Sequence, residues 1–229
     1  MNRILSAFIA SLFVLLSCSA AFADTERRYT LADHGAITLK LPDGWVDQVR
    51  RPRPELPPTI IMQPAAGAPF QVLITPIWPM RANTPKLTLE SLSAHVRSAA
   101  EEAKSQSVEK DLPLQSLSAP GIFGAYFSAT DRAAKPGEFE FLTQGMLSLA
   151  DLSVTFTILT NRGQEAIVPK ALAMLKSLRR ELQTGAGENE SVRLSARVDM
   201  HISKGGSTPQ DEVLFKSFLH SVSFQPKPE

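Results

Sequence analysis

The amino-acid sequence predicts an α+β fold in which helices pack on a mostly antiparallel sheet. Several short segments, such as 36–41, alternate apolar and polar residues as half-buried strands do. Two longer segments, 88–105 and 164–182, repeat apolar residues every three or four positions, which is the period of an amphipathic helix. Turn-forming residues separate successive strands, so neighbouring strands can pair as antiparallel hairpins.

The N-terminal part of the predicted fold is extended. The sequences DHG at 33–35 and PDG at 42–44 have turn composition, because proline fixes φ and glycine tolerates positive φ. Nine of the 17 prolines lie within residues 52–85, which excludes a lasting helix there. β-branched and aromatic residues in that region still favour two strands joined by the loop 64–69. The strands expected in this part of the chain are 28–32, 36–41, 59–63 and 70–78.

The central part adds two helices and a three-stranded meander. The first helix, over 88–105, has its apolar face at Leu89, Leu92, Val96, Ala99 and Ala103. Loops at 131–137 and 150–151 separate the strands of the meander, which are 122–130, 138–149 and 153–160. The second helix, over 164–182, has its apolar face at Val168, Leu172, Leu175, Leu178 and Leu182.

The C-terminal segment, 183–229, is predicted to dock on a core formed by residues 24–182. A polar linker at 185–190 precedes an alternating strand over 192–202 and a final helix over 208–222. An isolated strand and helix bury too little surface to be stable alone, so we expect them to add to an open edge of the sheet. The signals for the helix are Thr208, Pro209 and Asp211 at its start and Leu214, Phe218 and Val222 along one face.

The first 23 residues have the order of a secretory signal peptide. Arg3 supplies the positive charge, an apolar run occupies 4–16, and AFA at 21–23 is a small-residue cleavage site. We therefore expect cleavage before Asp24 and a periplasmic or secreted protein. The alternative is a lipoprotein anchored through Cys18, although the residues before this cysteine fit the acylation pattern poorly.

Composition excludes several classes of function. Cys18 is the only cysteine, so the exported part has no thiol for a disulfide, a metal site or a nucleophile. Removing residues 1–23 takes away one arginine and no acid, which leaves equal numbers of basic and acidic residues. Nucleic-acid binding is therefore not expected. The apolar run is shorter than the roughly 20 residues of a spanning helix, so no transmembrane helix is expected.

Five short stretches carry a resemblance to a known family. They are ITLKLPDGW at 37–45, LESL at 89–92, GAYFSATD at 124–131, FTIL at 156–159 and MLKSL at 174–178. In this order they resemble the PsbP-like α/β/α sandwich family over roughly residues 29–182. The resemblance implies that fold, and it implies a binding or assembly role without shared catalytic residues. The segment after residue 183 departs from the family pattern.

No catalytic, cofactor-binding or metal-binding residue is predicted. The chain has no nucleophile-elbow, zinc-protease, phosphate-loop or dinucleotide-binding motif. The four histidines are His34, His95, His201 and His220. They are scattered along the chain, and we expect each to be structural or solvated. Asp199 and His201 share one strand face, but Arg197 on the same face would repel a metal ion.

Two polar stretches are candidate binding features. Four loop residues at the end of the meander could line a small-molecule site, although such runs are usually solvated hairpin loops. These residues are Asp131, Arg132, Lys135 and Glu138. The second stretch, RRPRPELPP at 50–58, has the three-residue spacing of a basic polyproline II ligand at Arg51, Pro54 and Pro57. In an exported protein we expect it to be a stiff connector instead.

These observations predict an exported, non-catalytic binding or accessory protein of the cell envelope. Its partner is an envelope protein or a small ligand of unknown identity, and no cofactor is expected. The alternative is a small periplasmic hydrolase whose active site follows no sequence motif. An enzyme needs a concave pocket with titratable groups within hydrogen-bond reach, whereas an accessory module presents a flat or loop-lined patch.

Overall fold

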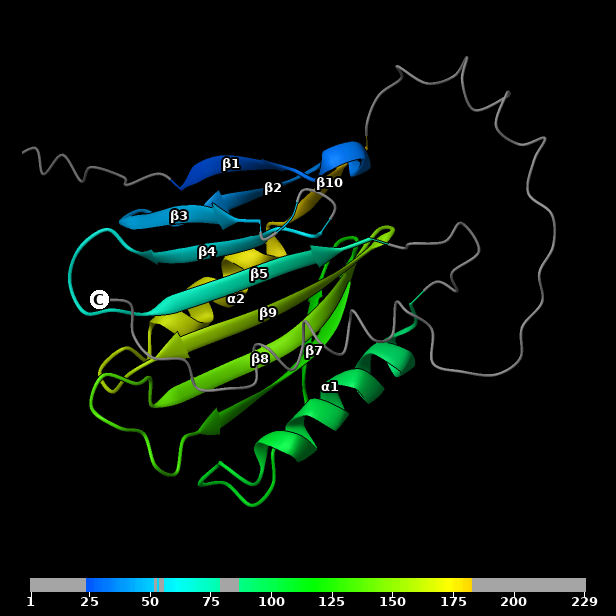
Figure 1. Cartoon of the computed structure of the whole chain (residues 1–229). Coiled ribbons are helices and arrows are strands. Elements are labelled where there is room, and N and C mark those ends of the chain that lie inside the picture. Colours follow the sequence, from blue (N-terminus) through cyan, green and yellow to red (C-terminus); the bar gives the residue numbers. More distant parts are fainter. Residues whose placement is uncertain (1–23, 52, 54–55, 79–86, 183–229) are drawn as a thin grey trace, which may run out of the picture.

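The computed structural model describes residues 24–51, 53, 56–78 and 87–182 (Figure 1). The first strands are β1 (Thr25–Thr30), β2 (Ala36–Leu41), β3 (Trp45–Arg50), β4 (Thr59–Pro64) and β5 (Gln71–Ile77). The later strands are β6 (Gln115–Ala119), β7 (Ile122–Thr130), β8 (Phe141–Leu149), β9 (Leu152–Thr160) and β10 (Arg179–Glu181). The helices are the short 3-10 helix η1 (Ala32–His34), α1 (Leu89–Ala103) and α2 (Ile167–Lys176).

The strands form two antiparallel sheets. The larger sheet has seven strands in the order β3-β4-β5-β9-β8-β7-β6, and the smaller has three in the order β1-β2-β10. Strands β7, β8 and β9 pair in sequence order along their whole lengths, which confirms the predicted meander. Figure 1 shows α1 in front of the large sheet and α2 behind it. The predicted α+β fold, with helices packed on a mostly antiparallel sheet, is confirmed.

Strands β8 and β9 are buried on both faces. Successive side chains of a strand point to opposite faces, yet every residue of β9 and every residue of β8 after Phe141 is buried. One core lies between the large sheet, α2 and the small sheet, and includes Leu147 and Phe156. The other core lies between the large sheet and α1, and includes Phe127 and Met146. The large sheet is therefore the central layer of a sandwich.

Helix α1 begins at a capping box. The Thr88 hydroxyl accepts a hydrogen bond from the Ser91 amide, and the Ser91 hydroxyl accepts one from the Thr88 amide, each at 3.1 Å. These bonds satisfy amides that have no partner within the helix. The predicted apolar face is buried against β7 and β8, except that Leu89 is 50% exposed.

The predicted helix over 164–182 is too long at both ends, because α2 spans only Ile167–Lys176. The Ser177 hydroxyl donates to the carbonyl of Met174 at 2.6 Å and accepts the amide of Lys40 at 2.9 Å. Arg179–Glu181 then pairs with β2 as strand β10. Residues 179–181 therefore pair with the open edge of β2, although their apolar spacing predicts a helix. Leu182, predicted on the helix face, is 70% exposed.

Strands β3 and β6 lie in segments for which the sequence predicts no strand. Both are at the edges of the large sheet. Strand β3 exposes Val46 and Val49, and β6 buries only Leu117, so neither has a clear apolar alternation. These segments are strands because β3 pairs with β4 and β6 pairs with β7.

Two predicted regions lie outside the described residues. They are the signal peptide, 1–23, and the C-terminal strand and helix within 183–229. The division of the chain into these regions and the core stays a prediction. No helix in the described part of the chain combines the length and apolar character needed to cross a membrane.

Gly145 lies where β8 approaches its neighbours most closely. A Cβ added to Gly145 would lie 2.5 Å from Tyr126 Cβ and 2.7 Å from Phe156 Cζ. These neighbours cannot move without disturbing the buried sheet. We predict that Gly145→Ala lowers the free energy of unfolding by about 2 kcal/mol, measured by urea denaturation. Ser118→Ala on the exposed edge β6 is the control and should change it by less than about 0.5 kcal/mol. Equal effects of both substitutions would contradict the close approach.

Candidate functional site

The histidines in the described part of the chain lie on separate elements. His34, in η1, stacks on Trp78 with the ring centroids 4.4 Å apart. His95, on α1, has its Nδ1 2.7 Å from the carbonyl oxygen of Ser91 one turn earlier. Both rings therefore have local structural partners. The other two histidines, His201 and His220, lie outside the described residues. So do Asp199 and Arg197, which share the predicted strand face with His201.

The candidate loop after β7 is held by hydrogen bonds close to the loop itself. Asp131 Oδ1 accepts the amide two residues further on at 2.9 Å. The Arg132 guanidinium donates to the carbonyl of Ser107 at 2.7 and 3.1 Å. The Glu138 carboxylate accepts the amide of Lys135 at 2.9 Å. The neighbouring end of the large sheet has a hollow lined by residues such as Glu109 and Thr130. None of the four loop candidates lines it.

Part of the polyproline-like stretch, 50–58, contacts the rest of the fold. Arg51 donates from its guanidinium to the carbonyl of Thr30 at 3.0 Å, and Pro58 is buried. Residues 52, 54 and 55 lie outside the described part, so the alignment of Arg51, Pro54 and Pro57 stays untested.

A hollow of about 280 Å³, whose accessible lining is mostly apolar with a few polar groups, opens at one end of the large sheet. Strands β7 and β9 end there and β8 begins there, because the three strands run antiparallel. The segment after α1 forms one side and the residues before α2 form the other. The lining residues are Glu109, Ser128, Ala129, Thr130, Phe141, Leu142, Thr143, Thr160, Asn161, Glu165 and Val168.

Hydroxyl side chains from three strands contribute to this lining. Ser128 and Thr143 are register partners on β7 and β8, and their hydroxyl oxygens are 2.8 Å apart. Thr160, the last residue of β9, lies opposite Phe141. Thr143 and Thr160 are each 3% exposed. Of these three hydroxyl residues only Ser128 is exposed, so it presents the accessible hydroxyl, and Thr143 supports it from below.

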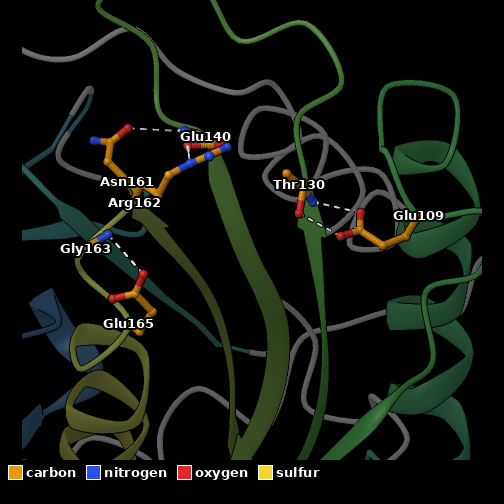
Figure 2. A network of polar contacts seen from close by, with 7 residues as sticks. All are labelled: Glu109, Thr130, Glu140, Asn161, Arg162, Gly163 and Glu165. Carbon is orange, nitrogen blue, oxygen red and sulfur yellow. Dashed lines mark hydrogen bonds and ion pairs between the residues drawn. The ribbon is translucent and has the colours of Figure 1, made fainter.

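Glu109 forms one side of the hollow as an anion held by neutral donors (Figure 2). Its carboxylate accepts the Thr130 amide at 2.9 Å, the Thr130 hydroxyl at 2.6 Å and the Ser107 hydroxyl. Partial burial raises the pKa of the Glu109 carboxyl, but the hydrogen bonds from Ser107 and Thr130 outweigh this and lower the pKa to about 2.

The opposite side is formed by polar residues between β9 and α2, which also contact Glu140 just before β8 (Figure 2). Asn161 Oδ1 accepts the amide of Glu140 at 3.3 Å, and the Arg162 guanidinium binds the Glu140 carboxylate with Nε 3.2 Å from Oε2. Glu165 accepts the amide of Gly163 at 3.0 Å. Hydrogen bonds from its own amide and from that of Gly163 lower the pKa of Glu165. This side therefore also presents a carboxylate.

The charged side chains that line the hollow are both acidic. Both lining carboxylates, Glu109 and Glu165, have lowered pKa values and are ionised near neutral pH. The lining residues include no lysine, arginine or histidine. The nearby Arg162 is bound to Glu140, which does not line the hollow. The arrangement can accept hydrogen bonds from a ligand rich in donors, and it disfavours an anion.

The described residues contain no group of three or more histidine, cysteine, aspartate or glutamate side chains that could hold a metal ion. The hollow itself has two carboxylates on opposite sides and hydroxyls between them.

None of the residues that line this hollow is a binding candidate from the sequence. Ser128, Thr143 and Thr160 are 15 to 32 positions apart and read as ordinary strand residues. Glu109 lies in a polar segment without a pattern. One signal in the sequence points to this hollow. Polar residues lie at the end of β7, the start of β8 and the end of β9, and antiparallel pairing brings these three positions to the same end of the sheet.

Comparison with known proteins gives a resemblance of fold. No protein-family model and no curated protein matches the chain. A cyanobacterial PsbP protein (CyanoP) of Synechocystis sp. PCC 6803, solved in solution, is 11% identical with a TM-score of 0.44, covering 73% of this chain and 99% of that protein. A protein of Bacteroides thetaiotaomicron VPI-5482, solved by crystallography, is 9% identical with a TM-score of 0.41, covering 65% of this chain. The chain spans 46% of the Bacteroides protein.

These two similarities carry no inference about a ligand, a partner or an activity.

The lowered pKa of Glu109 predicts a pH dependence of stability. The bonds to its carboxylate contribute above the ordinary pKa of 4.5, and this contribution is lost as the pH falls through about 2. Between the ordinary pKa of 4.5 and a pH of about 2, the free energy of unfolding should fall further in the parent than in Glu109→Gln. After allowance for solvent screening, we expect this difference to be on the order of 1 to 2 kcal/mol. Urea denaturation at a series of acidic pH values measures this. Glu102→Gln, at an exposed position of α1, should keep the parent profile. Parallel profiles for the parent and Glu109→Gln would contradict the prediction.

Proposed function

We propose that this protein is an exported, non-catalytic binding protein of the cell envelope, and that the hollow binds a small polar ligand that is neutral or positively charged. The observation that carries the proposal is the combination of strand hydroxyls with two ionised carboxylates and no lining cation. Such a surface pairs with hydroxyl or ammonium donors of a ligand.

The dimensions of the hollow support a small ligand. Its volume of about 280 Å³ is near the lower limit of small-molecule sites, which begin at roughly 300 Å³. Phe141 and Val168 add apolar surface for the carbon skeleton of the ligand. A few fixed polar groups within a partly apolar lining are typical of sites that orient a small molecule.

The carboxylates favour binding over catalysis. A general acid or base works best with a pKa near the working pH. The pKa of Glu109 is about 2 and that of Glu165 is lowered, so neither is suited to carry a proton near neutral pH. Glu109 is instead occupied as an acceptor for Ser107 and Thr130. These features support the binding function rather than the hydrolase alternative.

Binding is tested by calorimetry on the protein that begins at Asp24. The probes are a short diamine, a monosaccharide and a dicarboxylate of similar size. We expect the diamine or the monosaccharide to bind and the dicarboxylate not to bind. Thr143→Val removes one hydroxyl and keeps the shape, so it should weaken binding by roughly three- to tenfold.

Thr155→Val is the matched control for Thr143→Val. Thr155 is also a buried threonine of the central meander, but it does not line the hollow. This substitution should leave the affinity unchanged. Exclusive binding of the dicarboxylate, equal affinities of the parent and Thr143→Val, or no binding of any probe would contradict the proposed ligand class.

Export predicts a defined N-terminus. Strand β1 begins at Thr25, so cleavage before Asp24 leaves the whole first strand in the mature protein. We expect the intact mass of protein recovered from the periplasm to equal that of residues 24–229. A mass that begins at Cys18 and carries diacylglycerol would overturn this prediction and indicate a lipoprotein.

A further inference from the structure

One half of the large sheet has no described helix over it on the α1 side. Helix α1 packs on β7 and β8. Strand pairing places Leu73 opposite Thr157 and Ile61 opposite Leu73. These side chains share a face with Gln144, which pairs with Thr157 and lies on the same side of β8 as Leu142 and Met146 of the α1 core. The uncovered half therefore consists of β9, β5 and β4.

Side chains on this half are nevertheless shielded from solvent. Ile61 is 5% exposed, Thr155 5% and Thr157 2%. Ile61 belongs to neither of the two cores that the described residues form. An isoleucine near the edge of a sheet loses its exposure only when something packs on it.

We propose that residues 208–222 pack as a helix across β5 and β9 on the α1 side of the large sheet, beside α1. The sequence of this segment begins with an N-cap and a proline and has a broad apolar face. That face consists of Leu214, Phe215, Phe218, Leu219 and Val222. Apolar residues of the sheet face, including Ile61 and Leu73, supply the complementary surface.

The lengths match. A helix over 208–222 is about 22 Å long at 1.5 Å per residue. Strands β5 and β9 have seven and nine residues and so are about 23 to 30 Å long. The helix therefore covers the length of the strands, as α1 does for β7 and β8.

The chain can reach this face. Leu182 follows β10 and is 70% exposed, so the chain leaves the fold at the surface. Residues 183–207 can extend up to about 80 Å, which exceeds the dimensions of a domain of this size. The inference does not depend on the proposed ligand of the hollow.

Cysteine labelling tests the proposal on the whole mature chain. Residues 24–229 contain no cysteine, so one reporter can be introduced at a time. In the Ile61→Cys protein we expect a maleimide to react at least about tenfold more slowly than in Val46→Cys, because labelling requires local opening. Val46, on β3, is 41% exposed and serves as the open reference.

Substitutions in the segment identify what covers the face. Adding Leu214→Asp and Phe218→Asp to the Ile61→Cys protein should raise the labelling rate by about tenfold, since aspartate cannot pack on the sheet. Lys216→Asp, on the polar side of the predicted helix, is the matched control and should leave the rate unchanged. Thr157→Cys is a second reporter in case Ile61→Cys disturbs folding, which circular dichroism monitors.

Three results would overturn the proposal. Labelling of the Ile61→Cys protein as fast as that of Val46→Cys would mean that the face is open. Protection that persists after Leu214→Asp and Phe218→Asp would mean that another segment covers it. Protection that disappears on dilution would mean that a second copy of the chain covers it.

Discussion

The burial of β8 and β9 on both faces is the constraint on which the rest of the structure depends. A central antiparallel hairpin of this kind needs a layer on each side, because apolar side chains alternate between the faces. Helix α1 supplies one layer, and α2 with the small sheet supplies the other. Gly124 and Gly145 have no Cβ, which allows β7 and β8 to pack closely against neighbouring backbone and Phe156. The α1 layer covers β7 and β8 and leaves the rest of its face without a described helix.

The hollow arises where the strands of this hairpin meet water. Threonine and serine fit a strand and also hydrogen-bond, so β7, β8 and β9 can continue to this end of the sheet with hydroxyl side chains. Glu109 is stabilised there by hydroxyl and amide donors rather than by a cation. Such donors stabilise the carboxylate without cancelling its charge. The site thus keeps a negative potential that an ion pair would have neutralised, and the proposed ligand class depends on this difference.

The small sheet is tied to the large one by Arg180. Its side chain is 7% exposed, and its Nε is 2.8 Å from Oδ1 of Asp151 in the turn between β8 and β9. It also donates to the carbonyl of Ala36 on β2 at 3.3 Å. The hydrogen bond from Arg180 lowers the pKa of Asp151, which keeps this carboxylate ionised. A buried guanidinium is costly unless it is paired, so these bonds hold β10 against β2 and beside the central hairpin.

The sequence by itself determined the fold class, the central meander and helix α1, because these depend on local periodicity and on turn and capping residues. Periodicity failed where a strand is defined by its partner, as in the edge strands β3 and β6 and in β10, whose apolar spacing is that of a helix. The hollow was also beyond sequence reasoning. Glu109, Ser128, Thr143 and Thr160 come from four separate segments, and none has a distinctive neighbourhood in the sequence. Only the antiparallel pairing of three strands brings their ends together, and that pairing is a long-range property of the tertiary structure.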